Sequence, residues 1–180
     1  MLYRFAALTG LRAAELASLT RASLDLGSDV PTVTIKAADA KSRRTDVLPL
    51  HADLASALRD WLADDDAPDV ISLAMHRSGS KRTLWPQRWA EQCEGARLVR
   101  HDLKAAGIPY ADEDGLVFDF HALRSQFITS LGRSGVPLQI AQKLARHRDP
   151  KLTANIYTKM GVDELADAVA KLPGFKDTGS

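Results

Sequence analysis

Residues 32–62 read TVTIKAADAKSRRTDVLPLHADLASALRDWL, and a change of hydrophobic period inside this stretch decides the fold class. Residues 32–35 and 47–50 are short apolar runs on either side of a polar turn, a pattern that is typical of a β-hairpin. From residue 51 the apolar side chains recur every three or four positions, as they do along one face of a helix. We therefore predict an antiparallel hairpin that leads directly into a helix.

Helical periodicity continues on both sides of this hairpin. It predicts helices over 1–9, 13–17, 51–62, 85–106, 121–133, 138–145, 153–159 and 164–172, and further short strands near 24–26 and 70–73. Gly10 ends the first helix, because glycine tolerates the left-handed conformation that closes a helix. The expected fold class is α+β, mostly α-helical with a small antiparallel three-stranded sheet.

The composition fits a folded soluble domain. The chain has 180 residues, of which 45% are hydrophobic and 26% charged, and a chain of this size buries enough surface to need neither disulfides nor a structural metal. Its single cysteine, Cys93, cannot form an internal disulfide, and no Cys/His cluster has the spacing of a zinc site. Neither a signal peptide nor an apolar run of about 20 residues is present. We expect a cytoplasmic protein without a bound metal or cofactor.

Charge is unevenly distributed although the formal net charge is only +1. Residues 51–74 carry six acidic side chains and one basic one, and residues 111–119 carry four acidic side chains and no basic one. Residues 120–160 reverse this pattern, with seven basic side chains against one acidic one. This asymmetry favours one face that binds an anion and another that keeps the protein soluble.

Six polar residues stand at the ends of the predicted elements: Arg12, Lys41, His121, Arg124, His147 and Tyr157. Taken singly, each is more often a surface residue or a satisfied core residue than a catalyst. Their joint order along the chain is what points to a function.

The sequence around these residues resembles the tyrosine recombinase (phage integrase) family, and the resemblance covers residues 9–159. TGLRAAEL at 9–16 is similar to the first arginine motif of that family, and KSRRTDVLPL at 41–50 to its hairpin with a lysine eight residues before a proline. HALR at 121–124 matches its His-x-x-Arg motif. LARH at 144–147 and NIYT at 155–158 resemble its last histidine and its tyrosine.

The resemblance implies a phosphoryl transfer that needs neither metal nor ATP. Arg12 and Arg124 would neutralise the phosphate, because guanidinium groups stay charged and offer a planar fork of donors. Tyr157 would attack phosphorus to give a 3′-phosphotyrosyl link and a free 5′-hydroxyl. The link preserves the phosphodiester energy, so the hydroxyl of a second strand can reverse the step.

The remaining three residues would move protons or hold the phosphate. Lys41 is expected to protonate the departing 5′-oxygen. His121 would accept the proton of the nucleophile or position it, and His147 would hydrogen-bond the phosphate or the leaving oxygen. These two histidines could exchange roles.

The partner that the resemblance implies is double-stranded DNA at a recombination site. Basic side chains expected to touch its phosphates are Arg43, Arg44, Lys81, Arg82, Arg146, Arg148 and Lys151. For Lys81 and Arg82 a solvated loop is an equally good interpretation. On DNA we expect a homo-oligomer, a tetramer, whereas the free chain is left open between a monomer and an oligomer. The last helix could dock on its own core or on a neighbouring protomer.

The sequence departs from the family pattern in two ways. The family commonly places its tyrosine nine residues after this histidine, whereas Tyr157 follows His147 by ten, so one residue must be absorbed in the turn around Asp149. The N-terminal core-binding domain of the family is not seen. We therefore predict a single catalytic domain over 1–180, with that N-terminal domain absent from this chain.

Other interpretations compete with a recombinase. Residues 130–144 have the helix, glycine-containing turn and helix of a helix-turn-helix DNA-binding module, which would need neither Arg12, Lys41 nor Tyr157. A relative that has lost strand cleavage, or a type IB topoisomerase, would share most of the motifs. Trapping on a nicked duplex would separate a binding module from an enzyme.

Overall fold

The computed structural model describes residues 1–41, 43–63, 83–85, 95–157 and 170. These residues fall into two compact units, residues 1–127 and residues 128–180. Helix α6 (Phe120–Arg133) gives its first eight residues to unit 1 and the others to unit 2.

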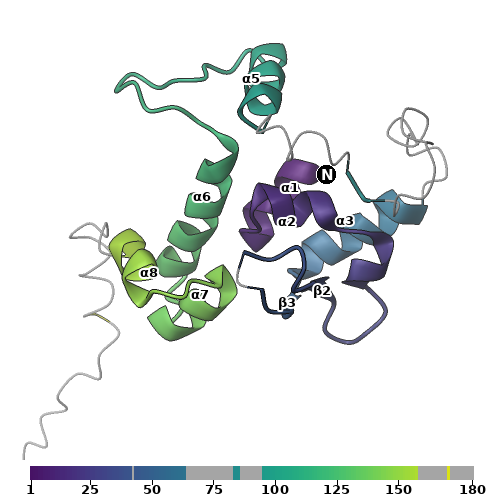
Figure 1. Cartoon of the computed structure of the whole chain (residues 1–180). Coiled ribbons are helices and arrows are strands. Elements are labelled where there is room, and N and C mark those ends of the chain that lie inside the picture. The colour runs from purple at the N-terminus through teal and green to yellow at the C-terminus, as the bar shows by residue number, and fades with distance from the viewer. Residues whose placement is uncertain (42, 64–82, 86–94, 158–169, 171–180) are drawn as a thin grey trace, which may run out of the picture. The chain divides into compact units, whose positions relative to one another are not determined.

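The predicted α+β class is confirmed (Figure 1). In order, the elements are α1 (Leu2–Thr9), α2 (Ala13–Ser18), the 3₁₀ helix η1 (Arg21–Ser23), β1 (Leu24–Asp25), β2 (Thr32–Ile35), β3 (Asp46–Pro49), α3 (Ala52–Ala63), α5 (Gly95–Ala105), α6, α7 (Leu138–Ala145) and α8 (Pro150–Tyr157). The residues in helices α1, α2, α3, α6 and α7 agree with the sequence prediction to within a residue or two.

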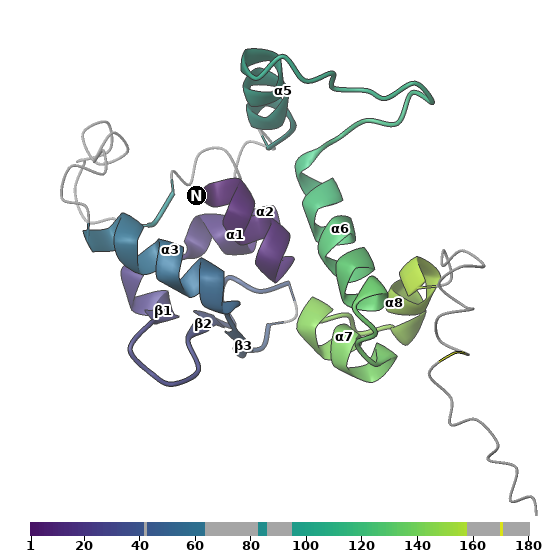
Figure 2. The ribbon, with the colours of Figure 1, turned by 180° about the vertical axis from the view of Figure 1, so that it is seen from behind.

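The sheet of unit 1 is antiparallel with the order β1-β2-β3. Val33 on the central strand lies opposite Leu24 on one side and Leu48 on the other. Along β2 half-buried and buried residues alternate, with Val33 and Ile35 buried, as expected for a strand that packs one face on a core. Helices α1, α2 and α3 lie beside this sheet in both ribbon views (Figures 1 and 2).

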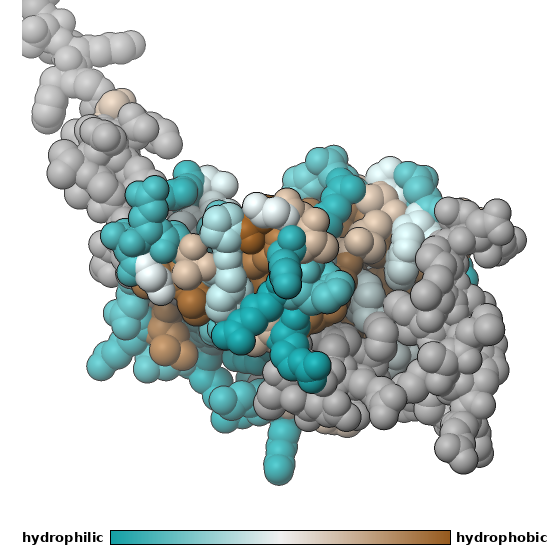
Figure 3. Space-filling view, turned by 90° about the horizontal axis from the view of Figure 1, so that it is seen from above, coloured by the Kyte–Doolittle hydropathy of each residue, from teal (hydrophilic) through white to brown (hydrophobic). Residues whose placement is uncertain are grey.

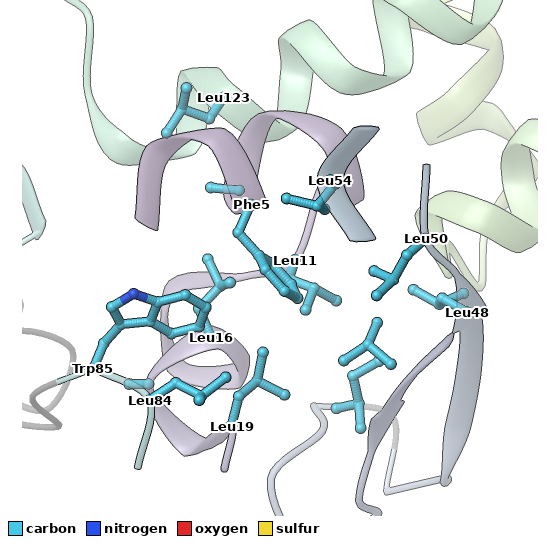
Figure 4. Packing of buried hydrophobic residues seen from close by; sticks show 14 of the residues in the cluster. Phe5, Leu11, Leu16, Leu19, Leu48, Leu50, Leu54, Leu84, Trp85 and Leu123 are labelled. Atoms are coloured by element: carbon cyan, nitrogen blue, oxygen red, sulfur yellow. The ribbon is translucent and has the colours of Figure 1, made fainter. Parts of the chain in front are cut away.

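The core of unit 1 is built mainly from these helices and the sheet (Figure 4). Phe5 of α1 and Leu16 of α2 are fully buried, as are Leu54 and Leu58 of α3. The ring of Phe5 meets that of Trp85 edge-on, with ring centroids 5.2 Å apart. Burial of aromatic and leucine side chains is the main stabilising contribution to a core of this kind.

The predicted start of a helix at Trp85 is wrong. Residues 83–85 are not helical: Thr83 bridges Thr20, and the N–H of Leu84 donates to the carbonyl of Leu19 at 2.7 Å. The indole of Trp85 stacks on that of Trp61. Packing of this large ring therefore outweighs local helix preference, and α5 begins at Gly95 in the described residues.

Unit 2 packs α7 and α8 beside the second half of α6. Its buried residues include Ile128 of α6, Ala141 and Ala145 of α7, and Thr153 of α8. The predicted helix over 153–159 starts earlier than expected, at Pro150. Proline is favoured at the first position of a helix because its missing N–H would have no partner there.

Hydrophilic side chains spread over the described part of the face in Figure 3, with hydrophobic residues showing between them. Among the described residues, no helix is long and apolar enough to cross a membrane. The same residues contain no group of three or more His, Cys, Asp or Glu side chains that could hold a metal ion. Two predicted elements lie outside the described residues: the strand 70–73 and, except for Ala170, the helix 164–172. Cys93 also lies outside them.

Candidate active site

Arg12 stands at the N-terminus of α2, directly after the turn that ends α1. Gly10 makes this turn with φ 60° and ψ 22°. The N–H of Arg12 donates to Oε2 of Glu15 at 2.8 Å, and its Nη1 donates to Oε1 at 3.1 Å. The Glu15 side chain is 2% exposed and that of Arg12 is 31% exposed. Glu15 thus anchors Arg12 from the core side and leaves part of the arginine open to a ligand.

Arg124, near the end of unit 1 in the sequence, contacts the same turn. It lies on α6, is 3% exposed, and its Nη1 donates to the carbonyl oxygen of Gly10. Gly10 and Arg12 are two residues apart, so one turn receives the guanidinium of Arg124 and carries Arg12. The fold thereby places at one turn two arginines that are 112 positions apart in the sequence. Their joint action on a phosphate stays a prediction.

Lys41 lies in the connection between β2 and β3 and is exposed. Backbone hydrogen bonds order this connection, including those from Ala40 N–H to the Lys36 carbonyl at 3.1 Å and from Arg43 N–H to the Ala40 carbonyl at 2.9 Å. Arg43 adopts a left-handed φ of 52°. The placement of Lys41 on the hairpin is as predicted, and its approach to the arginines stays a prediction.

His121 lies in the first turn of α6, three residues before Arg124. Its side chain is exposed. The Asp119 carboxylate accepts the Ala122 N–H at 2.9 Å and so caps the start of this helix. Residues three apart lie on the same side of a helix, so His121 and Arg124 share a face of α6.

His147 and Tyr157 belong to unit 2. Nδ1 of His147 lies 2.9 Å from the hydroxyl of Thr153, which is fully buried, and Nε2 of Gln142 donates to the His147 carbonyl at 3.1 Å. The contact with Thr153 orients the imidazole, and the bond from Gln142 holds the backbone of the turn. Tyr157 is the last residue of α8, and its side chain lies outside what the structure describes.

The ten-residue spacing from His147 to Tyr157 is accommodated by a short turn followed by a helix. Arg146 closes α7 with a left-handed φ of 54°. The chain then passes through residues 147–149 and enters α8 at Pro150. The hydrogen bond between His147 and Thr153 ties this turn to α8.

The basic residues predicted to contact DNA differ in exposure. Arg43, Arg44, Arg148 and Lys151 are exposed, and Arg146 is half-buried. Lys81 and Arg82 lie outside the described residues. The DNA contacts of all seven stay predictions.

Three features of the site were not assigned a role from the sequence: the carboxylate of Glu15, the carbonyl of Gly10 and the hydroxyl of Thr153. Glu15 stands three residues after Arg12, which is the spacing of a capping box, and this signal could have revealed it. The other two act through long-range or turn contacts for which the sequence carries no local signal.

Known proteins resemble this chain in sequence. The sequence pattern of the Phage integrase family matches residues 1–163. The tyrosine recombinase XerC of Pseudomonas fluorescens is 34% identical over 160 residues, which are 87% of this chain and 46% of that protein. XerA of Pyrococcus furiosus is 24% identical over 168 residues, 91% of this chain and 50% of that protein. The chain thus spans about half the length of these curated relatives.

Solved structures show the same fold at lower identity. The XerH site-specific recombinase, solved in a post-cleavage complex with palindromic difH substrate, covers 94% of this chain with a TM-score of 0.63 and 22% identity, over 44% of its own chain. The catalytic domain of bacteriophage HP1 integrase covers 94% with a TM-score of 0.57 and 15% identity, over 79% of its own chain. Fold, motif order and family pattern lead to one conclusion: the chain belongs to the phage integrase family of tyrosine recombinases.

Proposed function

We propose that this chain is the catalytic domain of a site-specific recombinase that cleaves and rejoins DNA strands through a 3′-phosphotyrosyl intermediate. The observation that carries the proposal is the turn after α1, where the Gly10 carbonyl holds Arg124 and Glu15 holds Arg12. Two oriented guanidinium groups are suited to a phosphodiester, whose transition state spreads negative charge over the non-bridging oxygens.

In the proposed reaction the phenolic oxygen of Tyr157 forms a bond to phosphorus while the bond from phosphorus to the 5′-oxygen breaks. His121 takes the phenolic proton, and Lys41 gives a proton to the departing 5′-oxygen. The imidazole of His147 donates a hydrogen bond to the phosphate. The reverse sequence, with the 5′-hydroxyl of a second strand as nucleophile, rejoins the DNA and frees the tyrosine.

Double-stranded DNA is the proposed substrate, and the cytoplasm is the proposed compartment. The XerH relative was solved with its difH substrate, which supports this class of ligand. The exposed cations Arg43, Arg44, Arg148 and Lys151 would contact backbone phosphates, which position a duplex without reading its sequence. We further propose that the chains assemble as a tetramer on DNA, which sedimentation of the free and DNA-bound chain would test.

A nicked suicide duplex, from which the cleaved piece diffuses away, tests the proposed function. Wild-type chain should form a covalent complex that resists denaturing electrophoresis, and Tyr157→Phe should form none while still binding the duplex. Tyr110→Phe is the matched control, because Tyr110 packs under the guanidinium of Arg100 at 4.5 Å rather than serving as the nucleophile.

Two results would reject the proposal. Specific binding by the wild-type chain without any covalent complex would favour the helix-turn-helix module or an inactive relative. Covalent trapping that persists in Tyr157→Phe would reject the assigned nucleophile. Transfer of the cleaved strand to a second duplex distinguishes a recombinase from a topoisomerase that only relaxes supercoils.

A further inference from the structure

Gly10 is a point of close contact between α6 and the turn that carries Arg12. A β-carbon added at Gly10 would lie 2.4 Å from Cδ1 of Phe127 and 3.0 Å from its Cγ. Real β-carbons essentially never come this close to another heavy atom. The ring of Phe127 therefore occupies the space that any other residue at position 10 would need.

Phe127 stands three residues after Arg124, so the two side chains project from the same face of α6. This face meets Gly10 twice. The Phe127 ring packs over its α-carbon, and Nη1 of Arg124 donates to its carbonyl oxygen. Since Arg124 is 3% exposed, its guanidinium has little freedom once the helix is held in this place.

The turn itself is held in a fixed shape. The Gly10 N–H donates to the Ala6 carbonyl at 2.9 Å, and the hydroxyl of Thr9 donates to the Phe5 carbonyl at 2.7 Å. Gly10 has φ +60°, a conformation that disfavours residues with a β-carbon. The direction of its carbonyl is thus determined by the end of α1.

We propose that Gly10 and Phe127 are positioning residues for the cleavage step. Phe127 seats α6 on Gly10, and the Gly10 carbonyl then orients the guanidinium of Arg124 beside the turn that bears Arg12. The two cations are set by one backbone turn rather than independently. This inference rests on the proposed function, because it assigns the arginines to the scissile phosphate.

Gly10→Ala tests the idea, with Gly107→Ala as the matched control. Gly107 also has a left-handed φ, +69°, but nothing lies within 4 Å of its added β-carbon. Gly107→Ala therefore carries the backbone cost without the contact. A displacement of about 1 Å at a catalytic group lowers rates roughly 100-fold, so Gly10→Ala should cleave the suicide duplex about 10- to 100-fold more slowly than Gly107→Ala.

A second variant covers the case in which Gly10→Ala does not fold. Phe127→Leu removes the ring that seats α6 and should slow cleavage in the same direction. Phe118→Leu is its matched control, since Phe118 is 40% exposed. Circular dichroism and duplex binding of each variant report whether it is folded.

The dependence of the cleavage rate on the charge of the scissile phosphate separates a positioning role from a merely structural one. A methylphosphonate is neutral and makes less use of a cation, so a displaced Arg124 should harm phosphodiester cleavage more than methylphosphonate cleavage. The ratio of the two rates should shift in Gly10→Ala and Phe127→Leu toward the ratio measured for Arg124→Ala. It should stay at the wild-type value in both controls.

Each other result has a defined meaning. Equal loss on both substrates, or rates equal to those of the control variants, would overturn the positioning role while leaving the proposed function intact. A wild-type chain that binds DNA but forms no phosphotyrosyl bond would reject the proposed function and this inference together.

Discussion

Replacing Glu15 by glutamine keeps the shape of the side chain and removes its charge. In the structure the two carboxylate oxygens accept from the backbone N–H and from Nη1 of Arg12, at 2.8 and 3.1 Å. The amide of a glutamine can accept through only one of its two terminal atoms. Glu15→Gln therefore leaves one Arg12 donor facing an NH₂ group.

The expected cost follows from burial. A hydrogen bond to a charged group contributes about 1.5–3 kcal/mol, and breaking a fully buried ion pair costs about 3–5 kcal/mol. The Arg12 side chain is 31% exposed, so water replaces part of what the carboxylate supplied. We expect the free energy of unfolding of Glu15→Gln to fall by about 2 kcal/mol, measured by urea denaturation.

Cleavage of the suicide duplex should fall as well, by about tenfold or more, because the guanidinium of Arg12 loses its anchor. Asp25→Asn is a suitable control: Asp25 also accepts several hydrogen bonds, from Gly27 and Ser28, but is exposed on the surface. It should cleave like the wild type. Unchanged stability together with unchanged cleavage in Glu15→Gln would refute the role given to this carboxylate.

Two further predictions concern hydrogen bonds to a histidine and a tyrosine. Thr153→Val removes the hydroxyl that holds Nδ1 of His147; we expect a stability loss of about 1 kcal/mol in urea denaturation and slower single-turnover cleavage, and cleavage at the wild-type rate would contradict an orienting role. Tyr3 donates to Asp102 at 2.5 Å, and this hydrogen bond is the largest cause that lowers the pKa of Asp102 below its ordinary value of 3.8. The stabilisation is therefore present above pH 3.8 and lost as the pH falls through the lowered pKa, so Tyr3→Phe and wild type should differ in urea denaturation at neutral pH and converge in acid; a constant difference would contradict this coupling.

Much of the fold was predictable because its signals are local. The helix over 138–145 has the predicted bounds, and the strand over 32–35 follows from its β-branched residues. Trp85 was misassigned because its place is set by the rings of Phe5 and Trp61, which are distant in the sequence. Local pattern carries no information about such a contact.

In the candidate site, too, some residues could be predicted from local sequence and others could not. The motifs predicted Arg12 and Arg124 as a catalytic pair, and in the structure Arg124 donates to Gly10, two residues before Arg12. Their catalytic role stays a prediction. The groups that hold them, the Gly10 carbonyl and the buried Glu15, were not assigned a role from the sequence. A backbone carbonyl has no sequence signature, and the burial of a carboxylate depends on tertiary packing.

The left-handed backbone at Arg43 and Arg146 bears on any effort to engineer a hardier version of this protein. Glycine is the usual choice for such positions, and exchanging each arginine for it would relax the main chain. Both arginines, however, are predicted to bind backbone phosphates of the nucleic acid. A gain in thermal stability at these two positions would therefore lower the predicted affinity for nucleic acid. Stabilising substitutions are better placed elsewhere in the chain.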